Sequence, residues 1–182
     1  MTEALREVIA PPRSLSATPS LRVTLTMDLY DEFFSLIEAL DGASVPYAVC
    51  GGIAVAIHGY PRFTEDIDLL IHPSDEQRAL QVAAARQFTL EGGRLPMGEG
   101  EDSKWEIVRV SKIVGKSLLT LDLMLAAEEV QLAWNDRAVV EYSGKRVSVV
   151  SRPGLKLLKQ LAGRRKDLLD LEQLGLNDET AH

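Results

Sequence analysis

Two aspartates alternate with apolar residues in the segment 66–71, DIDLLI, and this pattern constrains the fold more than any other part of the chain. Alternate residues of an extended strand face the same side, so Asp66 and Asp68 share one face and the apolar residues turn to the other. Neighbouring carboxylates repel each other, whereas a divalent cation accepts both as oxygen ligands. The segment therefore predicts a strand that carries part of a metal site. Acids exposed to water beside a helix cap are the alternative.

A pair of glycines stands upstream of these acids. Gly51 and Gly52 follow the apolar segment 47–50, which predicts a short buried strand, and precede the segment 53–58, which predicts a helix. A turn from strand to helix presents free backbone N–H groups and the positive end of the helix dipole, and both favour an anion. The pair predicts a phosphate seat, although Gly-Gly also occurs in ordinary tight turns.

The glycine pair, thirteen intervening residues and the acid strand together resemble the signature of the polymerase-beta-type nucleotidyltransferase superfamily. The string 59–69, GYPRFTEDIDL, is similar to a small bacterial branch of abortive-infection toxin-like nucleotidyltransferases. This resemblance implies an α/β fold of the α+β kind, the nucleotidyltransferase fold, with a mixed sheet, flanking helices and a C-terminal helical segment. Neither a Walker lysine pattern nor a GxGxxG pattern supports a rival phosphate site.

Members of the superfamily use a third carboxylate on a neighbouring strand, and Asp122 is the candidate here. Its segment 119–125, LTLDLML, places alternate leucines on the face opposite to Asp122. Glu106 is the reserve candidate, and an edge-strand aspartate facing water is the alternative for Asp122. The resemblance implies that Asp66, Asp68 and Asp122 are the catalytic residues and the metal ligands, with Mg²⁺ as the cofactor and Mn²⁺ as its substitute.

Basic residues supply candidates for nucleotide binding beside the glycines. Arg62 and Thr64 precede the acids, where a guanidinium can pair with phosphate oxygens or hold an acid in place. The segment 144–166 contains eight lysines and arginines and no acid, in a chain whose net charge is −7. Such a region can neutralise a triphosphate or an RNA backbone, or form a solvated helix face. Lys159 and Lys166 are its predicted nucleotide contacts.

The end of the chain resembles a C-terminal pattern of the toxin-like branch, in which a lysine helix is followed by Lys-Asp and a further Asp. Lys159, Lys166, Asp167 and Asp170 match this pattern. Whether the two acids take part in chemistry or cap and anchor the last helix stays open. Ser151, as a cap before Pro153, predicts where the lysine helix begins.

Length and composition indicate one globular domain. With 182 residues, 46% hydrophobic and 26% charged, the chain can bury a single core. We expect an N-terminal arm over residues 1–27, partly flexible, and one nucleotidyltransferase-like domain over 28–182. The sequence has no apolar run of about 18 residues and no secretory signal pattern, which predicts a cytoplasmic protein without a membrane partner. The single cysteine, Cys50, is expected to pack in the core.

Periodicity and turn residues predict several elements outside the motifs. We expect an amphipathic helix over 29–40, a capping-box helix from Ser74 to about residue 87, and a hairpin through Ser143-Gly144. The segment 92–102 lacks both period and apolar density, and predicts a long loop that could fold over a substrate.

The resemblance implies transfer of a nucleoside monophosphate from a nucleoside triphosphate to a hydroxyl acceptor, either RNA or protein. It also implies a toxin–antitoxin setting, with an antitoxin protein as a further partner. An antibiotic adenylyltransferase is one alternative, and a catalytically silent nucleotide-binding module is another. The sequence leaves open the base preference, the acceptor, the oligomeric state and the existence of an antitoxin.

Overall fold

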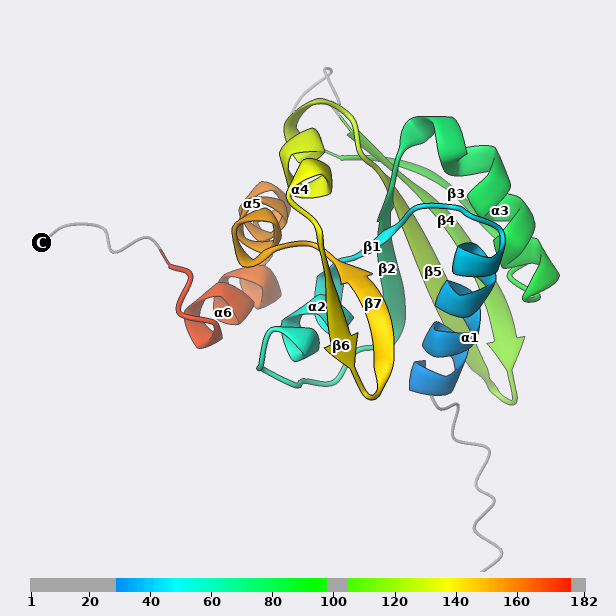
Figure 1. The fold of residues 1–182 in the computed structure, drawn as a ribbon, viewed down its shortest axis with the longest axis horizontal. Helices are drawn as coiled ribbons and strands as arrows, with labels where there is room; N and C mark the ends of the chain where they lie inside the picture. Colours follow the sequence, from blue (N-terminus) through cyan, green and yellow to red (C-terminus); the bar gives the residue numbers. More distant parts are fainter. Residues whose placement is uncertain (1–28, 98–104, 178–182) are drawn as a thin grey trace, which may run out of the picture.

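A computed structural model describes residues 29–97 and 105–177 of the chain. These residues form a seven-stranded mixed sheet with helices on both faces (Figure 1). The predicted mixed α/β architecture is therefore confirmed. The predicted arm over 1–27 lies outside the described residues, as does the part of the predicted loop from 98 to 102.

The strands of the sheet stand in the order β3-β4-β5-β2-β1-β7-β6. The pairs β2–β5 and β1–β7 are parallel, and the other neighbouring pairs are antiparallel. The two acid-bearing strands β2 and β5 are therefore adjacent and interior, with hydrogen-bonded neighbours on both sides. The strands are β1 Ala48–Val49, β2 Asp66–Ile71, β3 Leu90–Met97, β4 Trp105–Val114, β5 Ser117–Leu125, β6 Ala138–Tyr142 and β7 Lys145–Val149.

Helices α1 and α3 pack together on one face of the sheet, and α2 and α5 cover the other, where α6 and α4 lie against α5 (Figure 1). None of the helices in the described ranges has the length and apolar character that crossing a bilayer requires. The helices are α1 Leu29–Gly42, α2 Gly51–Ile57, α3 Glu76–Ala85, α4 Gln131–Asn135, α5 Arg152–Ala162 and α6 Arg165–Gln173.

Most predicted elements agree with the structure. The amphipathic helix is α1, whose buried side includes Phe33, Leu36 and Ile37. The predicted hairpin joins β6 to β7, and Ser143 and Gly144 both have positive φ, of 51° and 75°. Two consecutive left-handed residues match the twist of the flanking strands. The predicted capping box is less accurate, because Ser74 lies in a 3₁₀ turn, Pro73–Asp75, and α3 begins only at Glu76.

The loop predicted from residue 92 is wrong over its first six residues. Leu90–Met97 form the edge strand β3, which pairs with β4 and has a register shift between Glu91 and Gly93. A β-bulge accommodates one extra residue, and an edge strand tolerates proline because one of its sides needs no partner. Gly92, Gly93 and Pro96 break the alternation that would have indicated a strand.

Helix α5 begins and ends as its sequence predicts. The Ser151 hydroxyl accepts a hydrogen bond from the backbone N–H of Gly154 at 3.0 Å, and Pro153 occupies the first turn. Gly163 ends the helix in the left-handed region, with φ 59°. The Ser151 cap thus sets where α5, the helix that carries Lys159, begins.

Replacing the cap should destabilise the protein without touching the sheet. We expect Ser151→Ala to lower the free energy of unfolding by about 1 kcal/mol, since one orphan N–H of α5 loses its acceptor. Ser151→Thr keeps the hydroxyl and should retain most of that stability. Urea unfolding of the three proteins followed by circular dichroism measures the difference; an equal loss for Ala and Thr would contradict the capping role.

Candidate active site

The structure brings the three predicted acids onto one face of the sheet. Asp68 on β2 is the register partner of Asp122 on β5, and Asp66 is the partner of Thr120. Because residues two apart on a strand share a face, Asp66, Asp68 and Asp122 all lie on one side of two neighbouring strands. Asp122 is buried, and the other two are partly exposed. The reserve candidate Glu106 pairs with Arg94, at 2.8 Å, away from these acids.

Gly51 and Gly52 leave space for side chains of the acid strand and of the segment before it. The backbone N–H of Cys50 donates to the carbonyl of Asp68 at 3.0 Å, which ties the turn to β2. Gly51 has φ +60°, and a Cβ there would overlap the carboxylate of Asp68. A Cβ on Gly52 would lie 2.6 Å from Oγ1 of Thr64 and 3.2 Å from Nη1 of Arg62. The glycine pair thus lets Asp68, Thr64 and Arg62 approach the start of α2.

The surroundings of Asp68 oppose the ionisation of its carboxyl group. Burial, followed by the negative charges of Asp122 and Asp66, raises the pKa of Asp68 to about 6. The positive charges of Lys159 and Lys166 act in the opposite direction. A metal ion would remove the repulsion among the three carboxylates, which is the reason such a cluster favours a divalent cation.

Arg109 completes the site and was not among the predicted residues. It stands on β4 as the register partner of Asp122, and its Nε and Nη2 each donate to a different carboxylate oxygen of Asp122 at 2.7 Å. This hydrogen bonding raises the pKa of the Arg109 guanidinium. Strand alternation over 105–111 was the only sequence signal, and it does not single out this arginine.

Lys159 lies buried among acids, on the inner side of α5. Its ammonium donates to Asp167 at 2.8 Å and to Asp170 at 2.6 Å. Arg62 donates twice to Asp170, at 2.6 and 2.9 Å, and Arg164 donates to Asp167 at 2.7 Å. Burial by itself raises the pKa of both aspartates, but these hydrogen bonds outweigh it and lower their pKa. The network joins α6 to α5 and to the loop before β2.

A cavity of about 190 Å³ opens beside the acids, between the sheet and α5. Three acids and three basic residues line it, and most of the remaining wall is apolar. Its charged residues are Asp68, Asp122, Asp167, Arg109, Lys159 and Arg164, and its apolar residues are Leu95, Met97, Trp105, Ile107, Met124, Leu155, Leu158 and Ala162. Cys50 and Gly51 complete the lining. Acids, glycine turn and cavity therefore form one site.

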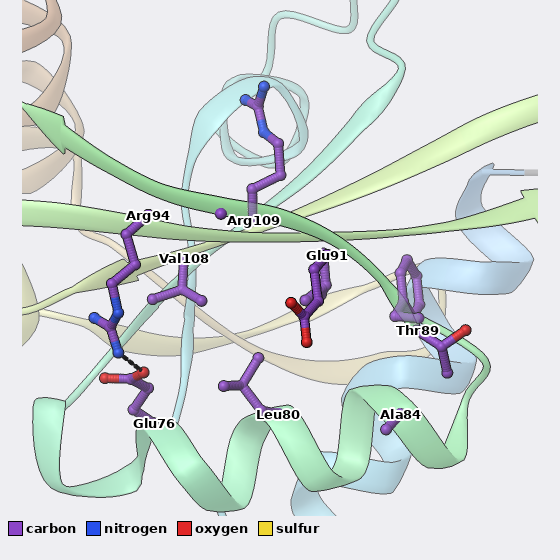
Figure 2. Close-up of a pocket in the computed structure, with 11 residues that line it drawn as sticks. Glu76, Leu80, Ala84, Thr89, Glu91, Arg94, Val108 and Arg109 are labelled. Carbon is purple, nitrogen blue, oxygen red and sulfur yellow. Dashed lines mark hydrogen bonds and ion pairs between the residues drawn. The ribbon is translucent and has the colours of Figure 1, made fainter.

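A larger hollow of about 430 Å³ lies on the opposite face of β3 and β4, against α3. Figure 2 shows Arg94 reaching down to Glu76 in this hollow, while the side chain of Arg109 leaves the strands in the opposite direction. Arg94 also pairs with Glu106. None of the three acids lines this hollow, whereas Asp68 and Asp122 line the smaller cavity, so the smaller cavity is the candidate site.

Comparisons with solved structures identify the fold. A candidate nucleotidyltransferase from Thermotoga maritima matches with a TM-score of 0.54 at 14% identity, over 79% of this chain and 90% of that one. The lincosamide antibiotic adenylyltransferase LnuA, lincomycin-bound, matches at 0.50 and 16%, over 81% and 97%. The antibiotic-resistance factor ANT(2″)-Ia matches at 0.51 and 16%, over 82% and 84%. This is the nucleotidyltransferase fold. No family model and no curated protein matches the sequence.

The donor set of this nucleotidyltransferase fold suits magnesium. Asp66, Asp68 and Asp122 offer hard carboxylate oxygens from two adjacent strands, which is the ligand type that Mg²⁺ and Mn²⁺ prefer. Within residues 29–97 and 105–177, however, no three acidic, histidine or cysteine side chains are placed to hold a metal ion as they stand. The Asp122 carboxylate is directed at Arg109 instead.

Gly51→Ala tests the contact between the turn and the acid strand. The added methyl group would meet the Asp68 carboxylate and would sit on a left-handed backbone. We expect at least about a tenfold loss of Mn²⁺ affinity and a destabilisation of about 1 to 3 kcal/mol. Isothermal titration calorimetry and urea unfolding measure the two effects. Gly144→Ala, a left-handed position with open space around it, controls for backbone strain alone.

Asp68→Asn should stabilise the metal-free protein in a pH-dependent way. The folded protein raises the Asp68 pKa from 3.8 to about 6, so ionising Asp68 costs stability above pH 6 and costs none below about pH 4. Asparagine cannot ionise, and we expect a gain of about 1 to 3 kcal/mol at pH 7.5 that shrinks as the pH falls from 6 to 4. Thermal unfolding in the presence of a chelator across this range measures the gain; a pH-independent difference would contradict it.

Proposed function

We propose that the protein is a magnesium-dependent nucleotidyltransferase that moves a nucleoside monophosphate from a nucleoside triphosphate to a hydroxyl acceptor. The observation that carries this proposal is the adjacency of Asp68 and Asp122 in one register row, with Gly51 directly against Asp68. An ordinary sheet has little reason to place two carboxylates side by side beside a glycine that admits one of them.

The reaction would be an in-line displacement at the α-phosphorus. The acceptor oxygen forms a bond to that phosphorus, the bond to the oxygen that bridges to the β-phosphate breaks, and pyrophosphate leaves. Bound magnesium would neutralise phosphate charge and lower the pKa of the acceptor hydroxyl. Asp66, Asp68 and Asp122 would hold the metal, and Asp122 is our candidate for accepting the proton of the hydroxyl.

Cations around the acids would bind the triphosphate. Arg62 and Thr64 lie against Gly52 at the start of α2, and the positive charge of Lys166 acts on Asp68. Positioning and charge neutralisation are the main tasks of a protein in such a transfer. Lys159 lines the cavity, and we propose that it supplies positive charge there while Asp167 and Asp170 fix its position.

We propose RNA or protein as the acceptor and a toxin-like role in the cytoplasm, with an antitoxin as partner. The C-terminal pattern that resembles the toxin-like branch supports this proposal, because three of its members, Lys159, Asp167 and Asp170, are joined by hydrogen bonds beside the cavity. Lys159 contacts both aspartates of the pattern.

An antibiotic adenylyltransferase is the second candidate, since LnuA and ANT(2″)-Ia share the fold. The cavity favours one kind of drug over another. Three acids and three bases balance its charge, so a polycationic aminoglycoside gains little attraction, whereas the apolar wall suits a less charged acceptor such as a lincosamide.

Radiolabelled nucleotides test the proposed function. The protein, Mg²⁺ and each of the four α-labelled nucleoside triphosphates are incubated with total RNA, with a protein extract or with lincomycin. We expect pyrophosphate release and a labelled acceptor in one arm. Asp66→Asn and Asp68→Asn should reduce the rate at least about a hundredfold, because metal-held charge contributes several kcal/mol to such a transition state.

Asp31→Asn serves as the matched control, since this exposed acid lies on α1 on the other side of the sheet. Its rate should equal that of the parent. Nucleotide binding without pyrophosphate release in any arm would contradict the proposed function and favour a catalytically silent module. Equal rates for Asp68→Asn and the parent would contradict the assigned site.

A further inference from the structure

Arg109 occupies the carboxylate that the proposed metal would need. Both Asp122 oxygens accept from its guanidinium at 2.7 Å, in a parallel, two-bond geometry. Paired hydrogen bonds of this kind are among the stronger ones that a carboxylate makes. This pairing turns the Asp122 carboxylate to Arg109, and within the described residues no three acidic, histidine or cysteine side chains are arranged to hold an ion.

The backbone of the edge strand β3 leaves space for the Arg109 side chain. Gly92 on the neighbouring edge strand lies against the Arg109 side chain, and a Cβ at Gly92 would overlap the Cγ of Arg109. The register shift of β3 falls at the same place, between Glu91 and Gly93. Glycine and bulge together leave the stem of Arg109 a path across the sheet toward Asp122.

The positive charge of Arg109 compensates the negative charges of the three acids. Asp66, Asp68 and Asp122 would repel one another on an uncompensated face, and within residues 29–97 and 105–177 Asp122 is the one of the three that forms an ion pair. The Arg109 side chain is 39% exposed and the Asp122 side chain 8%. Arg109 is thus the partner that reaches the solvent side, whereas the acid is buried in the sheet.

Resting on the proposed function, we propose that Arg109 holds Asp122 until metal and nucleotide arrive together, and then transfers its hydrogen bonds to the phosphate groups of the nucleotide. Metal alone must compete with Arg109 for Asp122. Metal that arrives with a triphosphate does not compete with Arg109, because the phosphate oxygens accept hydrogen bonds from the displaced guanidinium. Metal and nucleotide therefore bind with positive coupling, and the coupling depends on Arg109.

Metal affinity of the protein without nucleotide tests this inference. We expect Arg109→Gln to bind Mn²⁺ about tenfold more tightly than the parent, measured by electron paramagnetic resonance of free Mn²⁺. A nonhydrolysable nucleoside triphosphate should tighten Mn²⁺ binding in the parent and do so at least about fivefold less in Arg109→Gln. Unchanged Mn²⁺ affinity in Arg109→Gln would overturn the proposal.

Two further variants separate competition from bulk charge. Gly92→Ala keeps every charge but displaces the Arg109 stem, so Mn²⁺ affinity should rise as in Arg109→Gln. Arg94→Gln removes one positive charge from a side chain on the opposite face of the strands (Figure 2) and should leave the Mn²⁺ affinity unchanged. An equal gain in Arg94→Gln and Arg109→Gln, or no gain in Gly92→Ala, would overturn the proposal.

Failure of this inference is distinguishable from failure of the proposed function. A parent that transfers nucleotide, with Mn²⁺ affinity indifferent to Arg109, overturns only the role of Arg109. A parent and variants that all fail to bind Mn²⁺, with and without nucleotide, overturn both.

Discussion

Carboxylates from β2 and β5 share one face of the sheet and repel each other. The positively charged groups around them compensate this repulsion. Asp68 and Asp122 are register partners on parallel strands, so the backbone itself fixes their separation. Neither strand can shift by one residue without turning its apolar side chains out of the core. The compensation therefore comes from outside the pair, through Arg109 on β4 and the lysines of α5 and α6.

The C-terminal helices show how buried charge is managed at the same site. Lys159 is 4% exposed, and the acids that surround it are 1% and 3% exposed. Removing one partner from such a network leaves an unpaired charge in a medium that solvates it poorly, which is costly. Arg62 and Arg164 add further hydrogen bonds to the two acids. The network thus ties α6 to the segment that leads into the acid strand, and the position of one depends on the other.

The sequence predicted those parts of the fold in which local pattern and tertiary packing agree. The alternation in DIDLLI and LTLDLML, the Ser151 cap and the Ser143-Gly144 turn each correspond to an observed element. Arg109 and β3 could not be found in this way. The two glycines and the proline of β3 conceal a strand locally, and the partner of Arg109 is thirteen residues away on another strand, so only the assembled register shows their purpose.

The position of the acids within the sheet has a consequence for divergence. β2 and β5 are interior strands, constrained by neighbours on both sides, whereas β3 is an edge strand and α6 packs on the periphery. Substitutions and insertions accumulate most easily where few contacts must be preserved. In evolution, β3 and α6 can therefore change while the acids on β2 and β5 keep their positions. Homologous chains with very different sequences would still superimpose.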